Sequence, residues 1–384
     1  MEPIYYILIF VVIALALGLG LWLGLEKKKD EGAGSETVRW AAVGSGAHDL
    51  LYSIDGQSWQ PASGSSFGTR GYGVAYGLSS DGTPLWVAVG SGAHDLLYST
   101  DGQSWQPASG SSFGARGYGV AYGLSSDGTS LWVAVGSGAH DLLYSTDGQS
   151  WQPASGSSFG TGGRGSGVAY GLSSDGITPL WAAVGYGTNQ LLFSTDGQIW
   201  QPVSSDFGEG GSGYGVAYGL SSDGITSLWA AVGNSSGNDI LFSTDGQSWQ
   251  QASGSDFSGG GGGYGVAYGL SSDGTPLWAA VGSGTNALLY STDGQSWQAS
   301  GSSFGIGMFG DGVGNGVAYG LSSDGTPLWA AVGSGTNALL YSTDGQSWQA
   351  SGSDFSGGGG GIGDGVASNE PNPAFKESPY NPFT

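Results

Sequence analysis

One stretch of eight residues, YSTDGQSW, limits the fold of this chain more than any other feature. It occupies residues 98–105, and it returns unchanged from Tyr144, Tyr290 and Tyr341 and nearly unchanged from Tyr52, Phe193 and Phe242. A second motif, W(A/V)AVG, recurs with spacings of 46, 46, 49, 48, 49 and 51 residues, at Trp40, Trp86, Trp132, Trp181, Trp229, Trp278 and Trp329. A period of this length means that each repeat is one supersecondary unit and that the core forms where neighbouring units stack.

Each repeat contains four short runs, typified by GVAYG, LWAAVG, LLYSTD and SWQ, which Gly, Asp and Ser residues separate. Runs of this length between turn residues are typical of β-strands. Four strands in 40 to 50 residues are typical of one blade of a β-propeller. The 79 glycines do not indicate disorder here, because 12% of the residues are aromatic and can supply a core. We therefore predict an all-β fold, a seven-bladed β-propeller of four-stranded blades over residues 40–368.

The two ends of the repeat region complement each other. The first repeat begins at Trp40 with no GVAYG run before it, and the last ends in GDGVAS, residues 363–368, with no tryptophan strand after it. We predict that Val366 and Ala367 pair beside the Trp40 strand, so that the last segment completes the first blade. This pairing removes two exposed sheet edges.

The STDGQSW turn is expected to stabilise a β-hairpin. Asp and Ser side chains at such positions bond the amides of their own turn, Gly permits a positive φ, and the tryptophan buries its ring on the next strand. The aspartates are Asp55, Asp101, Asp147, Asp196, Asp245, Asp293 and Asp344, and the tryptophans are Trp59, Trp105, Trp151, Trp200, Trp249, Trp297 and Trp348.

The S-x-D-G-x-x-W pattern resembles the Asp-box, or BNR repeat, of sialidase-like β-propellers. That family usually has the Gly two residues and the aromatic five residues after the Asp. Here they follow by one and four residues, as in Asp101, Gly102 and Trp105, so a tighter turn is expected. The whole repeat also resembles repeat proteins common in large DNA viruses of algae and protists. The resemblance implies a propeller and a structural role for the motif, and a fold alone supports no activity.

Residues 4–25 are 22 residues without charge, which as a helix would span roughly 33 Å. No basic residue precedes them, unlike in a cleaved signal peptide, so we predict a single-pass membrane anchor between a tip of residues 1–3 and a linker of residues 26–39. Lys27, Lys28 and Lys29 follow the segment and place the propeller on the cytoplasmic side. The lack of cysteine favours a reducing compartment.

The charge balance argues against nucleic-acid binding, since 8 basic residues face 30 acidic ones and the net charge is −22. A sialidase needs three converging arginines, but Arg70, Arg116 and Arg164 are expected at near-equivalent loop positions before GVAYG, pointing in parallel unless they line the axis, and Arg39 precedes the first strand. His48, His94 and His140 are expected on three separate blades, too far apart for a metal site. The Asp-Gly turns lack the clustered oxygen ligands of a calcium loop. We predict no catalytic residues, no metal and no cofactor.

Two features suggest binding. The loops between SWQ and GVAYG vary most among the repeats, and variable loops on a fixed scaffold often carry recognition; drift in tolerant glycine loops explains them equally. The tail, residues 369–384, contains four prolines, which exclude a strand or helix, and three aromatic anchors, Phe375, Tyr380 and Phe383. It is interpreted either as an extended peptide that docks on a neighbouring protein or as a disordered end.

These observations favour a non-enzymatic, membrane-anchored propeller that acts as a structural or protein-interaction module. By resemblance, a virion protein that links a membrane to a capsid layer is expected. The alternative is an outward-facing lectin or adhesin that binds glycans through seven weak sites by avidity; the sequon Asn234-Ser235-Ser236 is compatible with it. A sialidase-like glycosidase is the third hypothesis.

Overall fold

The structure is a computed structural model that describes residues 37–234, 239–254, 256–257, 261–307, 310–353, 355, 361–376, 378 and 381–383. The predicted tip, residues 1–3, the predicted anchor, residues 4–25, and residues 26–36 of the linker lie outside the described residues. Among the residues described, no helix is long and apolar enough to cross a membrane.

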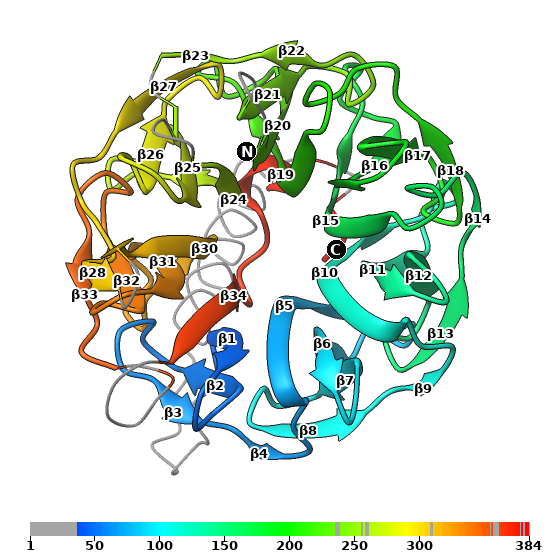
Figure 1. Ribbon diagram of the computed structural model, residues 1–384, viewed down its shortest axis with the longest axis horizontal. Coiled ribbons are helices and arrows are strands. Elements are labelled where there is room, and N and C mark those ends of the chain that lie inside the picture. The colour runs from blue at the N-terminus through cyan, green and yellow to red at the C-terminus, as the bar shows by residue number, and fades with distance from the viewer. Residues whose placement is uncertain are drawn as a thin grey trace, which may run out of the picture. The chain divides into compact units, whose positions relative to one another are not determined.

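The predicted seven-bladed propeller is confirmed: in the described part of the chain, seven sheets of four or five strands surround a central channel (Figure 1). From the channel outward, blade 1 contains β34 (Ile362–Ser368), β1 (Trp40–Ser45), β2 (Leu50–Ser53) and β3 (Gln60–Pro61). Blade 2 contains β5 (Gly68–Leu78), β6 (Pro84–Gly92), β7 (Leu96–Ser99), β8 (Ser104–Pro107) and β4 (Ser63–Gly64). Blade 3 contains β10 (Gly114–Leu124), β11 (Ser130–Gly138), β12 (Leu142–Ser145), β13 (Ser150–Pro153) and β9 (Ser109–Gly110).

The remaining blades repeat this order. Blade 4 contains β15 (Arg164–Leu172), β16 (Pro179–Tyr186), β17 (Leu191–Ser194), β18 (Ile199–Pro202) and β14 (Ser155–Gly156), and blade 5 contains β19 (Ser212–Leu220), β20 (Ser227–Asn234), β21 (Ile240–Ser243) and β22 (Gln250–Gln251). Blade 6 contains β24 (Gly263–Leu270), β25 (Pro276–Gly282), β26 (Leu288–Ser291), β27 (Ser296–Ala299) and β23 (Ser253–Gly254). Blade 7 contains β30 (Val313–Leu321), β31 (Pro327–Ser334), β32 (Leu339–Ser342) and β33 (Gln349–Ala350), and a small hairpin, β28 (Ile306–Gly307) and β29 (Gly310–Asp311), precedes it.

The glycine that opens each GVAYG run lets neighbouring inner strands approach each other around the channel. A Cβ added to Gly73 on β5 would lie 2.7 Å from the carbonyl oxygen of Tyr118 on β10, closer than real Cβ atoms come. The equivalent distance is 2.7 to 2.9 Å at all seven interfaces, from Gly73, Gly119, Gly167, Gly215, Gly265, Gly316 and Gly365. Any larger side chain at these positions would push two blades apart.

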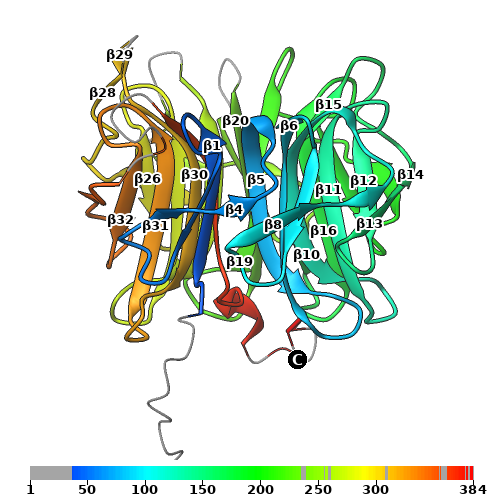
Figure 2. The ribbon, with the colours of Figure 1, turned by 90° about the horizontal axis from the view of Figure 1, so that it is seen from below.

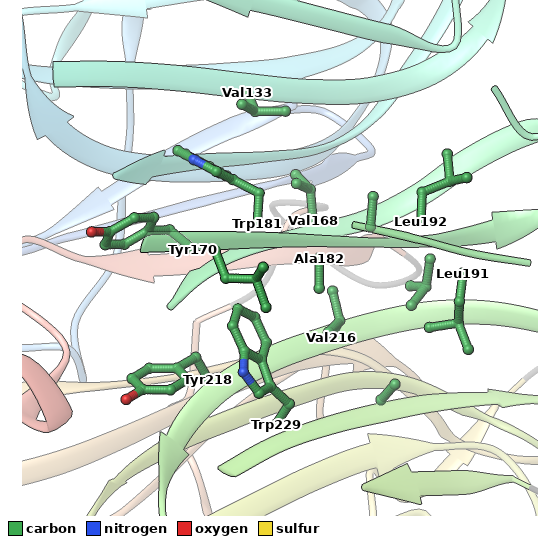
Figure 3. Close-up of a cluster of buried hydrophobic side chains, with 14 of the residues drawn as sticks. Val133, Val168, Tyr170, Trp181, Ala182, Leu191, Leu192, Val216, Tyr218 and Trp229 are labelled. Atoms are coloured by element: carbon green, nitrogen blue, oxygen red, sulfur yellow. The ribbon is translucent and has the colours of Figure 1, made fainter. Parts of the chain in front are cut away.

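In six of the seven described blades, a buried tryptophan on the second strand donates a hydrogen bond to the blade before it. Trp132 on β11 is fully buried, and its Nε1 donates to the carbonyl of Leu78, 3.0 Å away on β5. Each such bond contributes about 1 kcal/mol net. The same bond joins Trp40 to Leu321, Trp181 to Leu124, Trp229 to Leu172, Trp278 to Leu220 and Trp329 to Leu270. Figure 3 shows two successive copies, in which Trp181 and Trp229 lie beside the rings of Tyr170 and Tyr218.

The Asp-Gly turn forms the expected hairpin staple. Asp101 Oδ1 accepts from the amides of Gln103 and Ser104, at 2.8 and 2.7 Å, and from Ser99 Oγ at 2.9 Å, while Ser99 Oγ accepts from the Gly102 amide. Gly102 has a φ of 73°, where a side chain would be strained. The other six aspartates make the same three bonds, at Asp55, Asp147, Asp196, Asp245, Asp293 and Asp344.

The described parts of the segments between SWQ and GVAYG make regular contacts with the blades. In blades 2, 3, 4 and 6 a Ser-Gly pair from the preceding repeat adds a fifth strand, parallel to the outermost strand, so the prediction of four strands per blade is incomplete. The following phenylalanine is buried; Phe113, for example, is 0% exposed, and its amide donates to Asp95 Oδ2 at 2.8 Å. These segments therefore tie each blade to the next.

The ring is closed by the pairing that the two chain ends predict. β34 runs antiparallel to β1, with Val366 opposite Ala42 and Ala367 opposite Ala41. In Figure 1 the two strands, red and blue, lie side by side in one blade. Blade 1 therefore combines the first and last strands of the propeller.

Removal of β34 should destabilise the whole ring. Truncation after residue 361 exposes an edge of β1 and the surface against which Val366 packs. In the intact chain, Val366 is only 8% exposed. We expect the Tm to fall by about 10 °C or more, because 1 kcal/mol corresponds to roughly 2–4 °C in a domain of this size or slightly smaller. Truncation after Ser368 retains β34 and is the matched control, with an expected change of a few degrees. Equal melting curves for the two truncations, measured by circular dichroism, would contradict the role of β34.

The Asp-Gly turns should make the propeller sensitive to acid. Partial burial by itself raises the pKa of Asp101, but the amide bonds from Ser104 and Gln103 outweigh it, so its pKa lies below the ordinary value. The hydroxyl of Ser271 lowers the pKa of Asp273 to about 2. Groups with a lowered pKa stabilise the fold above the unfolded pKa, near 4, and lose this effect as they protonate. We expect a level Tm down to about pH 4.5 and a fall between about pH 4 and 2; a Tm that rises steadily to pH 2 would contradict it.

Candidate functional site

One end of the central channel is surrounded by tyrosines, one from the end of each inner strand except β34. We call this ring the tyrosine mouth; its members are Tyr76, Tyr122, Tyr170, Tyr218, Tyr268 and Tyr319, with Ser368 of β34 at the seventh position. Behind it lies a cavity of about 260 Å³, lined by these residues and by the Val and Ala of the GVAYG runs. The mouth is a concave surface with apolar walls and convergent hydroxyl groups, which are features of ligand-binding pockets.

The spacing between neighbouring tyrosines is set by glycine. Each ring lies over the glycine that follows the tyrosine of the preceding blade: a Cβ added to Gly77 would overlap the ring of Tyr122, and one added to Gly171 would overlap Tyr218. Five pairs of successive tyrosines share this arrangement, from Tyr76–Tyr122 to Tyr268–Tyr319. We call each pair a socket, because an aromatic side chain fits between its two rings.

The tail that follows β34 occupies two of these sockets. The ring of Phe375 lies 5.4 Å from that of Tyr170 and 5.2 Å from that of Tyr218. The ring of Phe383 lies 6.0 Å from Tyr76 and 5.3 Å from Tyr122. Figure 2 shows the tail, in red, across one end of the channel. Pairs of aromatic rings at these distances contribute about 0.5–1.5 kcal/mol each beyond the area they bury.

Polar contacts fix the path of the tail. Asn372 Nδ2 donates to the carbonyl of Tyr218 at 2.8 Å, and the Tyr122 hydroxyl donates to the carbonyl of Pro382 at 3.0 Å. Where the tail leaves the ring, the Asn369 amide donates to the carbonyl of Arg39, and Arg39 forms an ion pair with Glu370 at 3.2 Å. The start of the propeller and the start of the tail therefore meet on the same face.

The structure describes two of the three aromatic residues that were predicted as anchors of the tail. Phe375 and Phe383 act as anchors, but the surface they contact is the propeller of their own chain. Tyr380 lies outside the described residues. The prolines do not exclude all regular structure, because Pro373–Phe375 forms one turn of 3-10 helix, η1. Asn372 makes this turn favourable, since its side chain accepts from the amide of Ala374 at 2.9 Å.

The hydroxyls of the mouth remain protonated donors over a wide pH range. Burial, with a smaller effect from the charge of Glu370, raises the pKa of Tyr319 to about 12. Burial also raises the pKa of Tyr76, Tyr122, Tyr218 and Tyr268. The mouth therefore offers neutral aromatic faces with hydroxyl donors at physiological pH, a surface suited to aromatic and amide groups.

Three of the arginines lie near the other ends of the inner strands, namely Arg70, Arg116 and Arg164, whereas Arg39 lies beside the start of the tail. Arg70 on β5 donates two bonds to Asp364, at 2.5 and 2.6 Å. Arg116 on β10 contacts the Tyr118 hydroxyl at 3.5 Å, and the Arg164 guanidinium lies 5.4 Å from the Tyr118 ring. The expectation that these residues occupy loops and point in parallel is wrong: they belong to the inner strands, and two of them meet at one tyrosine. The pairing of β10 with β11 shifts register between Gly117 and Gly119 and continues to Gly114. The inner strand therefore begins several residues before GVAYG.

The three histidines that were considered as metal ligands lie on separate blades. His48, His94 and His140 lie in the turns after β1, β6 and β11, on three different blades. The residue after each histidine bonds the next segment: Asp49 accepts from the amide of Phe67 at 2.7 Å. Within the residues described, no group of three or more His, Cys, Asp or Glu side chains is arranged to hold a metal ion.

The tryptophans of the Asp-Gly turns lie between strands rather than on a surface. Trp105, Trp151, Trp200 and Trp297 are 1% exposed, Trp249 7% and Trp59 9%, while Trp348 is half-buried. Sequence reasoning missed the tyrosine mouth, although its signal is present in the sequence: the tyrosine of GVAYG recurs six times at a position where one strand end per blade reaches the channel.

No protein-family model matches the chain, and no curated protein matches it. Among solved structures, it is similar to a GH74 enzyme of Niastella koreensis, at 21% identity and a TM-score of 0.42, over 70% of this chain and 38% of that one. It is also similar to virginiamycin B lyase from Staphylococcus aureus, at 12% identity, a TM-score of 0.50 and 73% and 83% coverage. YCF48 bound to D1 peptide matches at 16% identity, a TM-score of 0.46 and 80% and 88% coverage. The likeness to the lyase is one of fold alone.

The tyrosine mouth should define an alkaline limit of stability. A pKa raised by folding means that stability is fully present below the unfolded pKa, near 10, and is lost as the pH rises through the folded pKa. With the pKa of Tyr319 at about 12, we expect the Tm to fall between about pH 10 and 12. Tyrosinate absorbance should show a late phase above pH 11, which Tyr319→Phe reduces. A single ionisation phase near pH 10 with an unchanged Tm would contradict this assignment.

Proposed function

We propose that this protein is a non-enzymatic β-propeller that acts as a protein-interaction module, and that the tyrosine mouth is its docking surface. One observation carries the proposal: the mouth holds a polypeptide segment, the tail, by inserting two phenylalanines between tyrosines and by two hydrogen bonds, one from the Asn372 side chain to the Tyr218 carbonyl and one from the Tyr122 hydroxyl to the Pro382 carbonyl. Side-chain insertion combined with main-chain hydrogen bonds is a general mode of peptide recognition.

The chemistry elsewhere on the ring supports an interaction role over catalysis. Of the arginines that a sialidase-like mechanism requires, Arg70 is neutralised by Asp364, which is itself 9% exposed. Glu209 lies on an exposed turn in the segment that connects β18 to β19. In the described part of the chain, neither Arg116 nor Arg164 forms an ion pair with a carboxylate, whereas glycoside hydrolysis uses a pair of carboxyl groups.

We further propose that residues 4–25 anchor the chain in a membrane, with the propeller on the cytoplasmic side, and that the module links this membrane to a protein layer such as that of a virion. The support is the uncharged segment and its flanking lysines, together with the resemblance to Asp-box repeat proteins of large DNA viruses. In the propeller, Arg39 pairs with Glu370, so the chain enters the ring on the same face as the mouth. A partner at the mouth would therefore approach the face from which the linker departs.

The lectin alternative has less support. It relied on tryptophan and tyrosine rings that stack on sugars, but the repeated tryptophans of the described blades are buried or half-buried between strands. The tyrosines of the mouth are available only in part, because the tail already contacts four of the six.

Site-specific photo-cross-linking tests the module. A photoreactive phenylalanine analogue placed at Tyr319, which lines the cavity and has no tail phenylalanine against it, should cross-link one defined segment of a partner polypeptide in membranes from the native source. The same analogue at Ile225, which is 82% exposed on the loop between β19 and β20, is the matched control. Equal cross-linking from both positions, or binding to a defined sugar on a glycan array without any protein cross-link at Tyr319, would contradict the proposal.

A further inference from the structure

We propose that the sockets of the tyrosine mouth recognise one chemical feature, an Asn-Pro turn with a phenylalanine two or three residues after the asparagine. We also infer that the socket formed by Tyr76 and Tyr122 is exchangeable, so that the same turn on a separate partner polypeptide replaces the end of the tail. This inference rests on the proposed function, because it names the partner chemistry of the same site.

The first observation is that the tail presents this feature twice. Its two socket-binding segments read Asn-Pro-Ala-Phe, residues 372–375, and Asn-Pro-Phe, residues 381–383. In both, the asparagine side chain accepts from the amide two residues later, from Ala374 at 2.9 Å and from Phe383 at 3.0 Å. Proline fixes φ at the second position, so the turn is largely formed before binding and loses little entropy on docking.

The second observation is that both turns insert a phenyl ring between two tyrosines, although the hydrogen bond that each turn makes with the mouth is different. Each phenyl ring lies between the tyrosines of two successive blades, and each turn exchanges one hydrogen bond with the mouth, through Asn372 or through the Pro382 carbonyl. Two independent insertions of one motif into two equivalent sockets indicate that the motif and the socket are complementary. The repeats form the receptor, and the tail carries two copies of the ligand.

The third observation is a difference between the two turns. Phe375 is 3% exposed and η1 packs against β19 and β24, whereas Phe383 is only half-buried. Less apolar area is therefore re-exposed to water when Phe383 leaves its socket than when Phe375 does. This difference favours the Tyr76–Tyr122 socket as the one that an incoming turn occupies.

The tethered tail competes with any partner. A ligand on a short flexible linker has an effective concentration on the order of millimolar at its own site. A free peptide should therefore bind weakly to the native chain and much more tightly once the resident phenylalanine is removed. A partner would overcome this competition by carrying more than one turn, or by being held at the same membrane.

The test uses the full-length chain in detergent and a fluorescent peptide with the sequence of residues 378–384, SPYNPFT. We expect fluorescence anisotropy to show binding to the Phe383→Ala variant with at least tenfold higher affinity than to the native chain. A peptide in which the asparagine is alanine, and one in which the phenylalanine is alanine, should each bind at least tenfold more weakly. Adding Tyr122→Phe to Phe383→Ala should weaken binding severalfold, because it removes the hydroxyl that donates to the Pro382 carbonyl.

Three results would overturn the inference: no binding to Phe383→Ala, equal binding to the native chain and Phe383→Ala, or equal binding of the alanine peptides. Ile225→Ala, on an exposed loop outside the mouth, controls for surface changes and should behave as the native chain. If the native chain forms dimers that Phe383→Ala abolishes, the occupant of the socket is the tail of a second copy. That result would overturn the proposal of a separate partner polypeptide.

Failure of this inference can be distinguished from failure of the proposed function. If a partner cross-links at Tyr319 but SPYNPFT does not compete with it, the interaction module stands and the turn chemistry is wrong. If SPYNPFT binds as expected but no polypeptide cross-links at the mouth, the sockets stand and the interaction function fails.

Discussion

The close approach of backbones around the channel is the constraint on which the ring depends: seven glycines on the inner strands face the carbonyl of the next inner strand, around the full circle. A methyl group at any of these positions would stand 2.7 to 2.9 Å from an oxygen atom. This approach fixes the radius of the ring, and the other layers follow from it. The tryptophans of the second strands reach the preceding blade only because the inner strands are this close, and the tyrosines of neighbouring blades become near neighbours for the same reason.

The tyrosines of the mouth therefore contribute to the packing between blades and also form a candidate binding surface. The tyrosine of GVAYG lies beside the tryptophan of its own blade, as Tyr122 does beside Trp132 with ring centroids 5.0 Å apart, and it covers the glycine of the preceding blade. Its outer face remains available to a ligand. A repeat that is selected for packing thus generates a circular row of similar sockets, and the tail of the chain uses two of them.

The blades and their closure could be predicted because each depends on short sequence patterns: strand runs between turns, and two incomplete ends that match. The buried role of Phe67 and its equivalents could not be predicted in the same way, since these residues stand in glycine-rich segments whose pairing with the next blade is a non-local property. The positions of Arg116 and Arg164 depended on how far the inner strands extend beyond GVAYG, which a bulge decides. The aromatic residues of the tail could be identified as possible anchors, with a disordered end as the alternative, but the surface that they contact exists only after seven strand ends have come together.

The pairing of β34 with β1 in blade 1, which closes the ring, has a consequence for how the protein is made. Because β34 follows every other strand in the chain and pairs with β1, the first of them, the ring stays open on the ribosome until all the other strands have emerged. During synthesis β1 and β30 each present a face that only β34 can cover, and exposed strand edges favour wrong pairing with other chains. The tail follows β34 directly, so its docking at the mouth marks a molecule whose circle is already complete.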